Sequence, residues 1–393
     1  MRAISLSEQI LALGHRVVLW SADYDHFSHK HRYGRNTKVR VSDSLEIRLI
    51  RSRGYERNLG PGRLVDHAQM AFELSRLLRN EDPPDAAFVG YPPIETAAVM
   101  TRWLKSAGIP SLVDVKDAWP EIFLRAVPPR LRPIGTLALT GYSHLATRCL
   151  RDATGLSSIT DDFLAWALSL CGRERRTSDA VFPLTAAPVQ ITDAALAEAG
   201  RWWDEQGVPN DGRLRGYFVG SLHSSYDFAP VAKAAEDSNF QIVVCGAGSS
   251  EGEVRALLGD RSNVVMPGWV SRNQAEALAR RSTVALAPIA PHPDFMMSLP
   301  NKYFDALSKG LPLVTGLSGT ITTELTQHNV GMSYGPGSDL TLAECLNVLG
   351  SDPLLVKQMS ANALALYERQ YRHDVVYRRM AEHLTGLTGG HLE

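Results

Sequence analysis

The 393-residue sequence lacks the marks of several protein classes. Its four cysteines form no CxxC pair and have no histidine-rich neighbours, so neither a disulfide framework nor a structural zinc site is predicted. No apolar run approaches the roughly 18 residues of a membrane span, and no signal-peptide pattern is visible. With 44% hydrophobic and 21% charged residues, a soluble chain of two ordinary domains is expected, residing in the cytoplasm.

Charge is balanced overall, with a net value of −1, but one stretch is strongly basic. Residues 30–63 contain ten lysines and arginines against three acidic residues. Such a stretch can attract anionic lipid headgroups or a phosphorylated acceptor, which predicts peripheral contact with the inner face of a membrane. The alternative is a solvated loop and strand edge. Nucleic acid is not expected as a partner, because the stretch has few aromatics and no nucleic-acid-binding motif.

Helical and strand patterns alternate along the chain in two cycles. The first cycle predicts helices over 4–13, 64–80 and 94–107 and strands over 15–22, 86–90 and 111–115. The second predicts strands over 215–220, 241–246, 263–268, 282–288 and 311–316, with helices at 227–237, 251–258, 271–281 and 301–309. Alternation of this kind predicts an α/β protein with two Rossmann-like units. Ligands of open α/β sheets bind at the carboxyl ends of the strands, so the site is expected in a cleft between the two units.

The segment SLPNKYFDALSKG (298–310) holds the richest chemistry. Pro300 marks the expected first turn of a helix, whose free amides and dipole favour a pyrophosphate at 298–302. Lys302 could add a point charge, and the carboxylate of Asp305 could accept hydrogen bonds from both ribose hydroxyls. The alternative is a surface ion pair between Lys302 and Asp305.

The run from 298 to 314 resembles the nucleotide-binding signature of family-4 retaining glycosyltransferases of the GT-B fold. It is closest to the branch, common in surface-polysaccharide assembly, that carries Pro-x-Lys before the carboxylate. VKDAWPE (115–121) resembles the DxWPE motif of this branch, and PPIETAA (92–98) its acceptor-side helix. FVGSL (218–222), CGAG (245–248) and the Pro-Gly-Trp-Val segment at 267–270 resemble the second domain's strand, glycine turn and base-contacting loop. A dinucleotide fingerprint is absent, because Glu251 replaces its third glycine, and this disfavours NAD.

The resemblance implies an acceptor domain over 1–190, a sugar-nucleotide domain over 205–370, and a C-terminal segment, 371–393, packing back on the first domain. It implies retaining transfer from a nucleotide sugar, with UDP the family's usual carrier, to a glycan or lipid-linked acceptor. No metal and no cofactor are expected. The candidate donor-binding residues are Gly220, Ser221, His223, Gly246, Gly248, Trp269, Val270, Ser298, Leu299, Asn301, Lys302 and Asp305.

Asp117 is the first catalytic candidate, because it follows the strand at 111–115 and its carboxylate could orient an acceptor hydroxyl or accept its proton. The alternative for Asp117 is a turn-capping role that holds Trp119. Glu121 is the second candidate. A front-face retaining mechanism uses the leaving diphosphate as base, so it needs no protein nucleophile.

Three departures from the family pattern bear on activity. Met297 stands where the wider family has the first glutamate of its E-x7-E pair, and residues 220–228 lack the family's phosphate-binding Arg and Lys. Ser221, His223 or Lys302 would have to compensate. The sequence also opens in what resembles the helix after the family's first strand. Either the start is internal or the first strand has been lost, and the second option would leave an open sheet edge or slot. Two alternatives therefore stand beside the transferase: a sugar-nucleotide epimerase of the same fold, and a non-catalytic binding subunit.

Overall fold

A computed structural model describes residues 2–26, 28–56, 60–259 and 261–389. The chain divides into two compact units, unit 1 with residues 1–183 and 374–393, and unit 2 with residues 184–373. The second domain had been expected to begin at residue 205, whereas the structure assigns residues 184–205 to it as well. The reason is α7 (Asp193–Glu205), whose fully buried Trp203 packs into the core of unit 2.

Unit 2 is built on one six-stranded parallel sheet with the order β12-β11-β10-β13-β14-β15. Its strands are β10 (Arg215–Val219), β11 (Gln241–Cys245), β12 (Val264–Gly268), β13 (Val284–Ala287), β14 (Leu313–Thr315) and β15 (Gly331–Ser333). The chain moves outward from β10 to β12, then returns to the other side of β10 with β13. The strand order therefore reverses between β10 and β13, which is the topological switch point of a Rossmann-type sheet.

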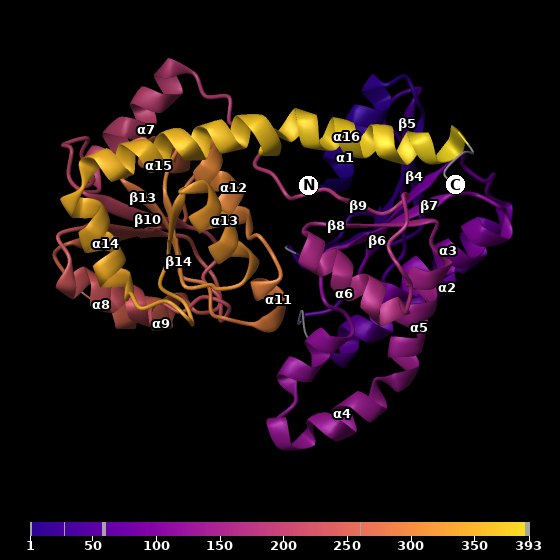
Figure 1. Cartoon of the computed structure of the whole chain (residues 1–393). Coiled ribbons are helices and arrows are strands. Elements are labelled where there is room, and N and C mark those ends of the chain that lie inside the picture. The colour runs from indigo at the N-terminus through magenta and orange to yellow at the C-terminus, as the bar shows by residue number, and fades with distance from the viewer. Residues whose placement is uncertain (1, 27, 57–59, 260, 390–393) are drawn as a thin grey trace. The chain divides into compact units, whose positions relative to one another are not determined.

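Helices cover both faces of this sheet (Figure 1). One face packs against α8 (Ala229–Asp237), α9 (Glu251–Leu258) and α14 (Leu342–Ser351). The other packs against α7, α10 (Arg272–Ala279), α12 (Asn301–Ser308), α13 (Thr320–His328), α15 (Pro353–Leu366) and the π-helical turn η4 (Tyr367–Tyr371). The short helix α11 (Pro293–Met296) lies in the connection from β13 to α12. Burial on both faces explains why these strands read as continuous apolar runs.

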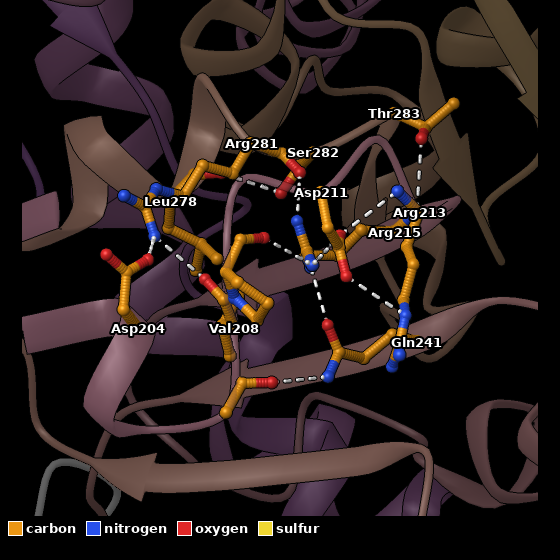
Figure 2. Close-up of polar contacts among 12 residues, drawn as sticks. Asp204, Val208, Asp211, Arg213, Arg215, Gln241, Leu278, Arg281, Ser282 and Thr283 are labelled. Atoms are coloured by element: carbon orange, nitrogen blue, oxygen red, sulfur yellow. Dashed lines mark hydrogen bonds and ion pairs between the residues drawn. The ribbon is translucent and has the colours of Figure 1, made fainter. Parts of the chain in front are cut away.

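A buried arginine holds the amino end of this sheet together (Figure 2). The guanidinium of Arg215, 1% exposed, donates to Gln241 Oε1 at 2.7 Å and to the carbonyl oxygens of Pro209 and Arg281. Arg281 donates in turn to the carboxylate of Asp204 at 2.6 Å. This network ties α7, β10, β11 and the α10–β13 connection together at the edge opposite the carboxyl ends of the strands, so its role is structural.

Unit 1 has its strands in two main sheets and a short hairpin. The sheet β1-β5-β4 pairs β1 (Val17–Ala22) parallel with β5 (Leu45–Ile50) and β5 antiparallel with β4 (Thr37–Arg40). The parallel sheet β6-β7-β8-β9 contains β6 (Ala87–Tyr91), β7 (Ser111–Val115), β8 (Gly155–Ser158) and β9 (Ala180–Val181). The hairpin joins β2 (Tyr24–Asp25) to β3 (Lys30–His31). The basic stretch at 30–63 thus contains paired strands as well as loop.

Helices of unit 1 pack on both sides of the strands. α1 (Arg2–Ala12) and α16 (His373–Gly386) share an apolar core with Leu112 and Phe182 (Figure 1). α2 (Pro61–Leu77) and α3 (Ile94–Ser106) share another core with β1 and β5. The remaining helices are α4 (Arg132–Ala138), α5 (Thr140–Asp152), α6 (Asp161–Cys171) and the short 3₁₀ turns η1 (Leu78–Asn80), η2 (Glu121–Ala126), η3 (Pro129–Leu131) and η5 (Leu387–Gly389).

Buried charge also marks the centre of unit 1. Asp114, in the middle of β7 and fully buried, accepts hydrogen bonds from Arg2 at 2.8 and 3.0 Å and from Ser157 at 2.8 Å. Arg2 donates further to the carbonyl of Phe182 at 2.8 Å. The ion pair therefore fastens the start of α1 to β7, β8 and the segment after β9.

A cavity of about 1120 Å³ lies along β1 and β6. Within the described residues, β1 pairs only with β5 and β6 only with β7. The amides of Val17 and Asp23 bond toward β5, so the backbone polar groups of the alternate residues Val18 and Trp20 point away from it, toward the cavity side.

Candidate functional site

The loops on either side of the switch point in unit 2 are hydrogen-bonded to each other. The loop after β10 and the loop after β13 are joined by the amide of Asp227 donating to Pro288 O at 2.7 Å and that of Ala290 donating to Ser225 O at 2.9 Å. Ligand sites of open α/β sheets form at this position, outside the carboxyl ends of the strands where the strand order reverses. Most of the residues singled out in the sequence lie on these loops or beside them.

Three glycines bring the backbone turns after β10 and β11 into close contact. A Cβ atom on Gly246 would lie 1.8 Å from the carbonyl oxygen of Gly220, and one on Gly248 would lie 2.2 Å from that of Leu222. Gly246 also has a φ of +140°, which side-chain-bearing residues rarely adopt. Glycine is required at Gly246 and Gly248 by packing within the protein, and the amides of Gly220, Leu222 and Gly246 donate to backbone carbonyls of the neighbouring turns.

The side chain of Lys302 reaches from α12 to the end of β10, beside the switch point. It projects from the first turn of α12, and its ammonium donates to the carbonyl of Val219 at the end of β10 and lies 5.2 Å from the centre of the Phe218 ring. A Cβ on Gly220 would lie 3.0 Å from Lys302 Nζ. Burial lowers the pKa of this lysine, and the nearby carboxylate of Asp305 partly opposes that effect. Lys302 is therefore a half-buried positive charge directly beside Gly220.

Asp305 does not pair with Lys302. Its carboxylate accepts a hydrogen bond from Lys309 Nζ at 2.8 Å, one turn further along, and its side chain remains 40% exposed. The alternative of a direct Lys302–Asp305 ion pair is therefore not what the structure forms. The Lys302 ammonium is directed to Val219 O instead, which leaves Lys309, four residues beyond Asp305, to reach the carboxylate. Asp305 retains exposed oxygen surface with which to meet a ligand.

The start of α12 is open to a ligand. Asn301 is the first helical residue and is exposed, and Pro300 is the N-cap rather than a residue of the first turn. No side chain caps this end of the helix. Ser298 is half-buried and donates its amide to Phe295 O at 3.2 Å, while Leu299 is buried and anchors the turn. The amides of the first turn thus face outward beside Lys302.

The other donor-site candidates surround this centre at different depths. Ser221 is exposed, and His223 is half-buried against the Tyr226 ring at 4.8 Å, where burial lowers its pKa. Trp269, just after β12, is 73% exposed, whereas Val270 beside it is buried in the core. Gly246 N donates to Gly268 O at 2.7 Å, which places the Trp269 loop next to the glycine turn. Val270 is therefore a packing residue, and Trp269 offers an exposed aromatic surface.

The catalytic candidates lie in unit 1. Asp117 is exposed in the turn after β7, and its carbonyl accepts the amide of Trp119 at 2.8 Å. Trp119 is buried, and its own carbonyl accepts from the Tyr91 hydroxyl at 2.6 Å. Glu121 is exposed and accepts from Trp166 Nε1 at 3.3 Å. The backbone of this turn is held rigidly, and the Asp117 side chain stands on its surface.

A buried polar cluster behind this turn was not singled out from the sequence. Arg63 stacks on the rings of Tyr55 and Trp119 at 5.4 and 4.9 Å, and its Nε donates to His67 Nε2 at 3.4 Å. His67 Nδ1 lies 3.7 Å from a carboxylate oxygen of Glu95. Glu95 was visible within the PPIETAA segment, but nothing in the sequence placed it beside α2. The contact forms only when α2 packs on α3.

This cluster has a defined protonation pattern. Burial, and then the charge of Arg63, lower the pKa of His67 to about 4, so the ring is neutral at neutral pH. Because Nε2 accepts from Arg63, the ring proton is assigned to Nδ1, which faces Glu95 Oε2 at 3.7 Å without forming a hydrogen bond, and burial raises the pKa of Glu95. His67 consequently acts as a neutral link that orients Arg63 at the wall of the unit 1 cavity.

The fold is that of an α/β protein with two Rossmann-like units, and the site candidates lie beside the switch point of unit 2. Residues 217–352, which contain all the donor-site candidates, match the model of a protein family described as glycosyl transferases group 1. A search of curated proteins finds no match. The matched region covers the strands and loops just described, from β10 to the end of α14.

Solved glycosyltransferase structures share the fold. Sucrose-phosphate synthase from Thermosynechococcus elongatus is similar with a TM-score of 0.72 and 13% identity, over 98% of this chain and 92% of that one. WaaG, a glycosyltransferase involved in lipopolysaccharide biosynthesis, gives 0.66 and 16%, over 98% and 95%. HepE from Anabaena, solved in complex with UDP, gives 0.62 and 14%, over 86% of both chains. The fold is that of the GT-B glycosyltransferases, and with the family match it supports a glycosyltransferase.

Proposed function

We propose that the protein is a retaining glycosyltransferase that moves a sugar from a nucleotide sugar to a glycan or lipid-linked acceptor in surface-polysaccharide biosynthesis. The observation that carries the proposal is Lys302, held against Val219 and Gly220 across the switch point of unit 2. The family match over residues 217–352 supports the donor class. UDP is the proposed carrier, supported by the complex of the similar HepE with UDP.

Donor binding follows from the side chains and amides around Lys302. The diphosphate would meet the Lys302 ammonium and the amides at the start of α12, and the ribose hydroxyls would donate to Asp305. Trp269 would offer its exposed ring to the base. Catalysis would then come from orienting the sugar and stabilising the charge on the departing diphosphate, without a metal or a protein nucleophile. Asp117 would orient the acceptor hydroxyl or accept its proton.

A second reading, a non-catalytic nucleotide-sugar-binding subunit, is favoured by two specific positions. Met297 replaces a glutamate of the resembled family, and residues 220–228 contain no arginine or lysine. Lys302 alone would then carry the positive charge of the donor site.

Peripheral contact with a membrane through the basic stretch at 30–63 is proposed as the means of reaching a lipid-linked acceptor.

Calorimetry with UDP, GDP and ADP, followed by an assay of UDP-sugar hydrolysis, tests these proposals. Asp305→Ala should weaken binding of the preferred diphosphate, whereas Asp117→Ala should leave binding unchanged and reduce turnover. If both variants bind every nucleotide as the parent does, the donor site is wrong. Binding with no turnover for any donor would favour the binding subunit over the enzyme.

A further inference from the structure

The segment around α4 exposes an unusual amount of apolar side chain. Leu131 is 50% exposed, Ile134 66% and Leu137 76%. These three residues recur at intervals of three, which places them along one side of the η3–α4 segment. We call Leu131, Ile134 and Leu137 the α4 surface. Figure 1 shows α4 standing away from the strands of unit 1, and the three apolar side chains of the α4 surface are at least half exposed.

The opposite side of α4 faces the protein. Gly135 and Leu139 are half-buried, and a Cβ on Gly135 would lie 3.0 Å from Leu124 and 3.5 Å from Val127. The helix is thus seated against η2 by one side, and this contact determines that Ile134 and Leu137 point outward. α4 has seven residues and none of them is buried, so packing within the protein does not explain the large apolar residues on its outer side.

Charge around the α4 surface has one sign. The sequence from residue 122 to residue 151 contains five arginines and no aspartate or glutamate. Arg130 and Arg132, which flank Leu131, are exposed. Apolar residues on a projecting edge, bordered by arginines, match the chemistry of a bilayer surface that contains anionic lipids. A second copy of the chain fits less well, because its own arginines would meet these arginines.

We propose that the α4 surface inserts into the interface of a bilayer containing anionic lipids, with Ile134 and Leu137 among the acyl chains and Arg130 and Arg132 at the headgroups. None of the helices in the described residues has the length and apolar character needed to cross a bilayer, so attachment here would be in the interface. This membrane site adds to the proposed function and does not depend on it.

The basic stretch at 30–63 is the other candidate for membrane contact, and at least three of its ten basic side chains form ion pairs within the protein. Lys38 pairs with Glu81 at 3.2 Å, Arg40 pairs with Asp43 at 2.7 Å, and Arg48 pairs with both Glu46 and Glu81. These carboxylates offset part of the attraction that the stretch would have for lipid headgroups. The α4 surface differs because it places three large exposed apolar side chains beside two exposed arginines.

Flotation of the purified full chain with lipid vesicles tests the proposal. Vesicles of phosphatidylcholine with about 30% phosphatidylglycerol are compared with pure phosphatidylcholine. The double variant Ile134→Ser, Leu137→Ser should lower partitioning to the anionic vesicles about tenfold or more. Arg130→Gln with Arg132→Gln should remove most of the difference between the two lipid compositions. The matched control is Leu354→Ser, since Leu354 is 78% exposed on α15 of unit 2 and should have no effect.

Four outcomes would overturn the membrane site. The first is a parent that floats with neither vesicle type, and the second is a serine double variant that floats as the parent does. The third is a dimeric parent that this variant makes monomeric without a change in flotation, which would assign the surface to self-association. The fourth is an Arg35→Gln, Arg51→Gln variant that loses flotation while the α4 variants keep it, which would assign membrane contact to the 30–63 stretch. Circular dichroism and thermal unfolding of every variant show folding, and UDP calorimetry of the parent tests the donor site separately.

Discussion

Replacing Lys302 by methionine is the sharpest test of the donor site. The substitution removes the ammonium that donates to Val219 O, while its similar length keeps apolar contact with the Phe218 ring. In the parent, the diphosphate of a bound nucleotide would gain one charge-assisted hydrogen bond from this ammonium. Such a bond contributes about 1.5–3 kcal/mol. Since about 1.4 kcal/mol is a factor of ten, Lys302→Met should weaken UDP binding by about 10- to 150-fold.

Stability should change much less than affinity. The carbonyl of Val219 loses its donor, which costs about 1–3 kcal/mol if it stays buried, but the cost of burying an ammonium disappears as well. The net change is small beside the roughly 5–15 kcal/mol by which a folded domain is stable. Lys233→Met on α8 is the matched control, because Lys233 is 67% exposed and pairs only with carboxylates of its own helix.

The pH dependence gives a second readout. Burial lowers the pKa of Lys302 below that of an ordinary lysine, and a bound diphosphate would favour the protonated form. UDP affinity of the parent should therefore fall as pH rises through that lowered pKa, earlier than an exposed lysine would allow. Calorimetry across alkaline pH measures this decline, which Lys302→Met should abolish. If that variant binds UDP as tightly as Lys233→Met and keeps the same pH profile, Lys302 does not contact the diphosphate.

Three further substitutions test the packing that positions the sites, each measured by urea unfolding. Arg215→Met leaves the oxygen acceptors of its network without a donor and should destabilise unit 2 by about 3–5 kcal/mol; a loss under about 1 kcal/mol would contradict a structural role. Gly246→Ala should lower the free energy of unfolding by more than about 2 kcal/mol, because its Cβ would lie 1.8 Å from a carbonyl oxygen. The control is Gly207→Ala, where φ is +76° and no atom lies nearby, and there the loss should be about 1 kcal/mol. Equal losses would mean that the positive φ alone, and not the close contact, disfavours a side chain at residue 246. Asp114→Asn leaves Arg2 buried without its counter-charge and should destabilise unit 1 by about 3–5 kcal/mol, and an unchanged unfolding midpoint would refute this.

Prediction from the sequence was most accurate for elements whose local pattern is strong. The strand at 111–115 and the helix at 251–258 have the predicted bounds, and the helix predicted at 301–309 is one residue shorter. Where a short apolar run ends in glycine or proline, that residue marks the end of the strand in the sequence itself. The hairpin of β4 and β5 was less visible, because its charged side chains alternate with apolar ones on a half-exposed sheet.

Contacts between distant segments were beyond local patterns. The alternative of a Lys302–Asp305 ion pair is not formed, because Lys302 donates to Val219 O and Lys309 pairs with Asp305; the ribose role of Asp305 stays a prediction. Arg63, His67 and Glu95 meet only where α2 packs on α3. Val270 was grouped with Trp269, but one is buried and the other exposed.

The sequence by itself determined the α/β class, the two cycles of strands and helices, and the glycine and lysine positions of the donor-site candidate, because periodicity and turn chemistry act over a few residues. Tertiary structure decided what depends on the meeting of distant segments. It brought Lys302 against Gly220, buried Arg2 on Asp114, and left Ile134 and Leu137 facing outward. Burial and pairing are properties of the packed fold, so no stretch of sequence carries them alone.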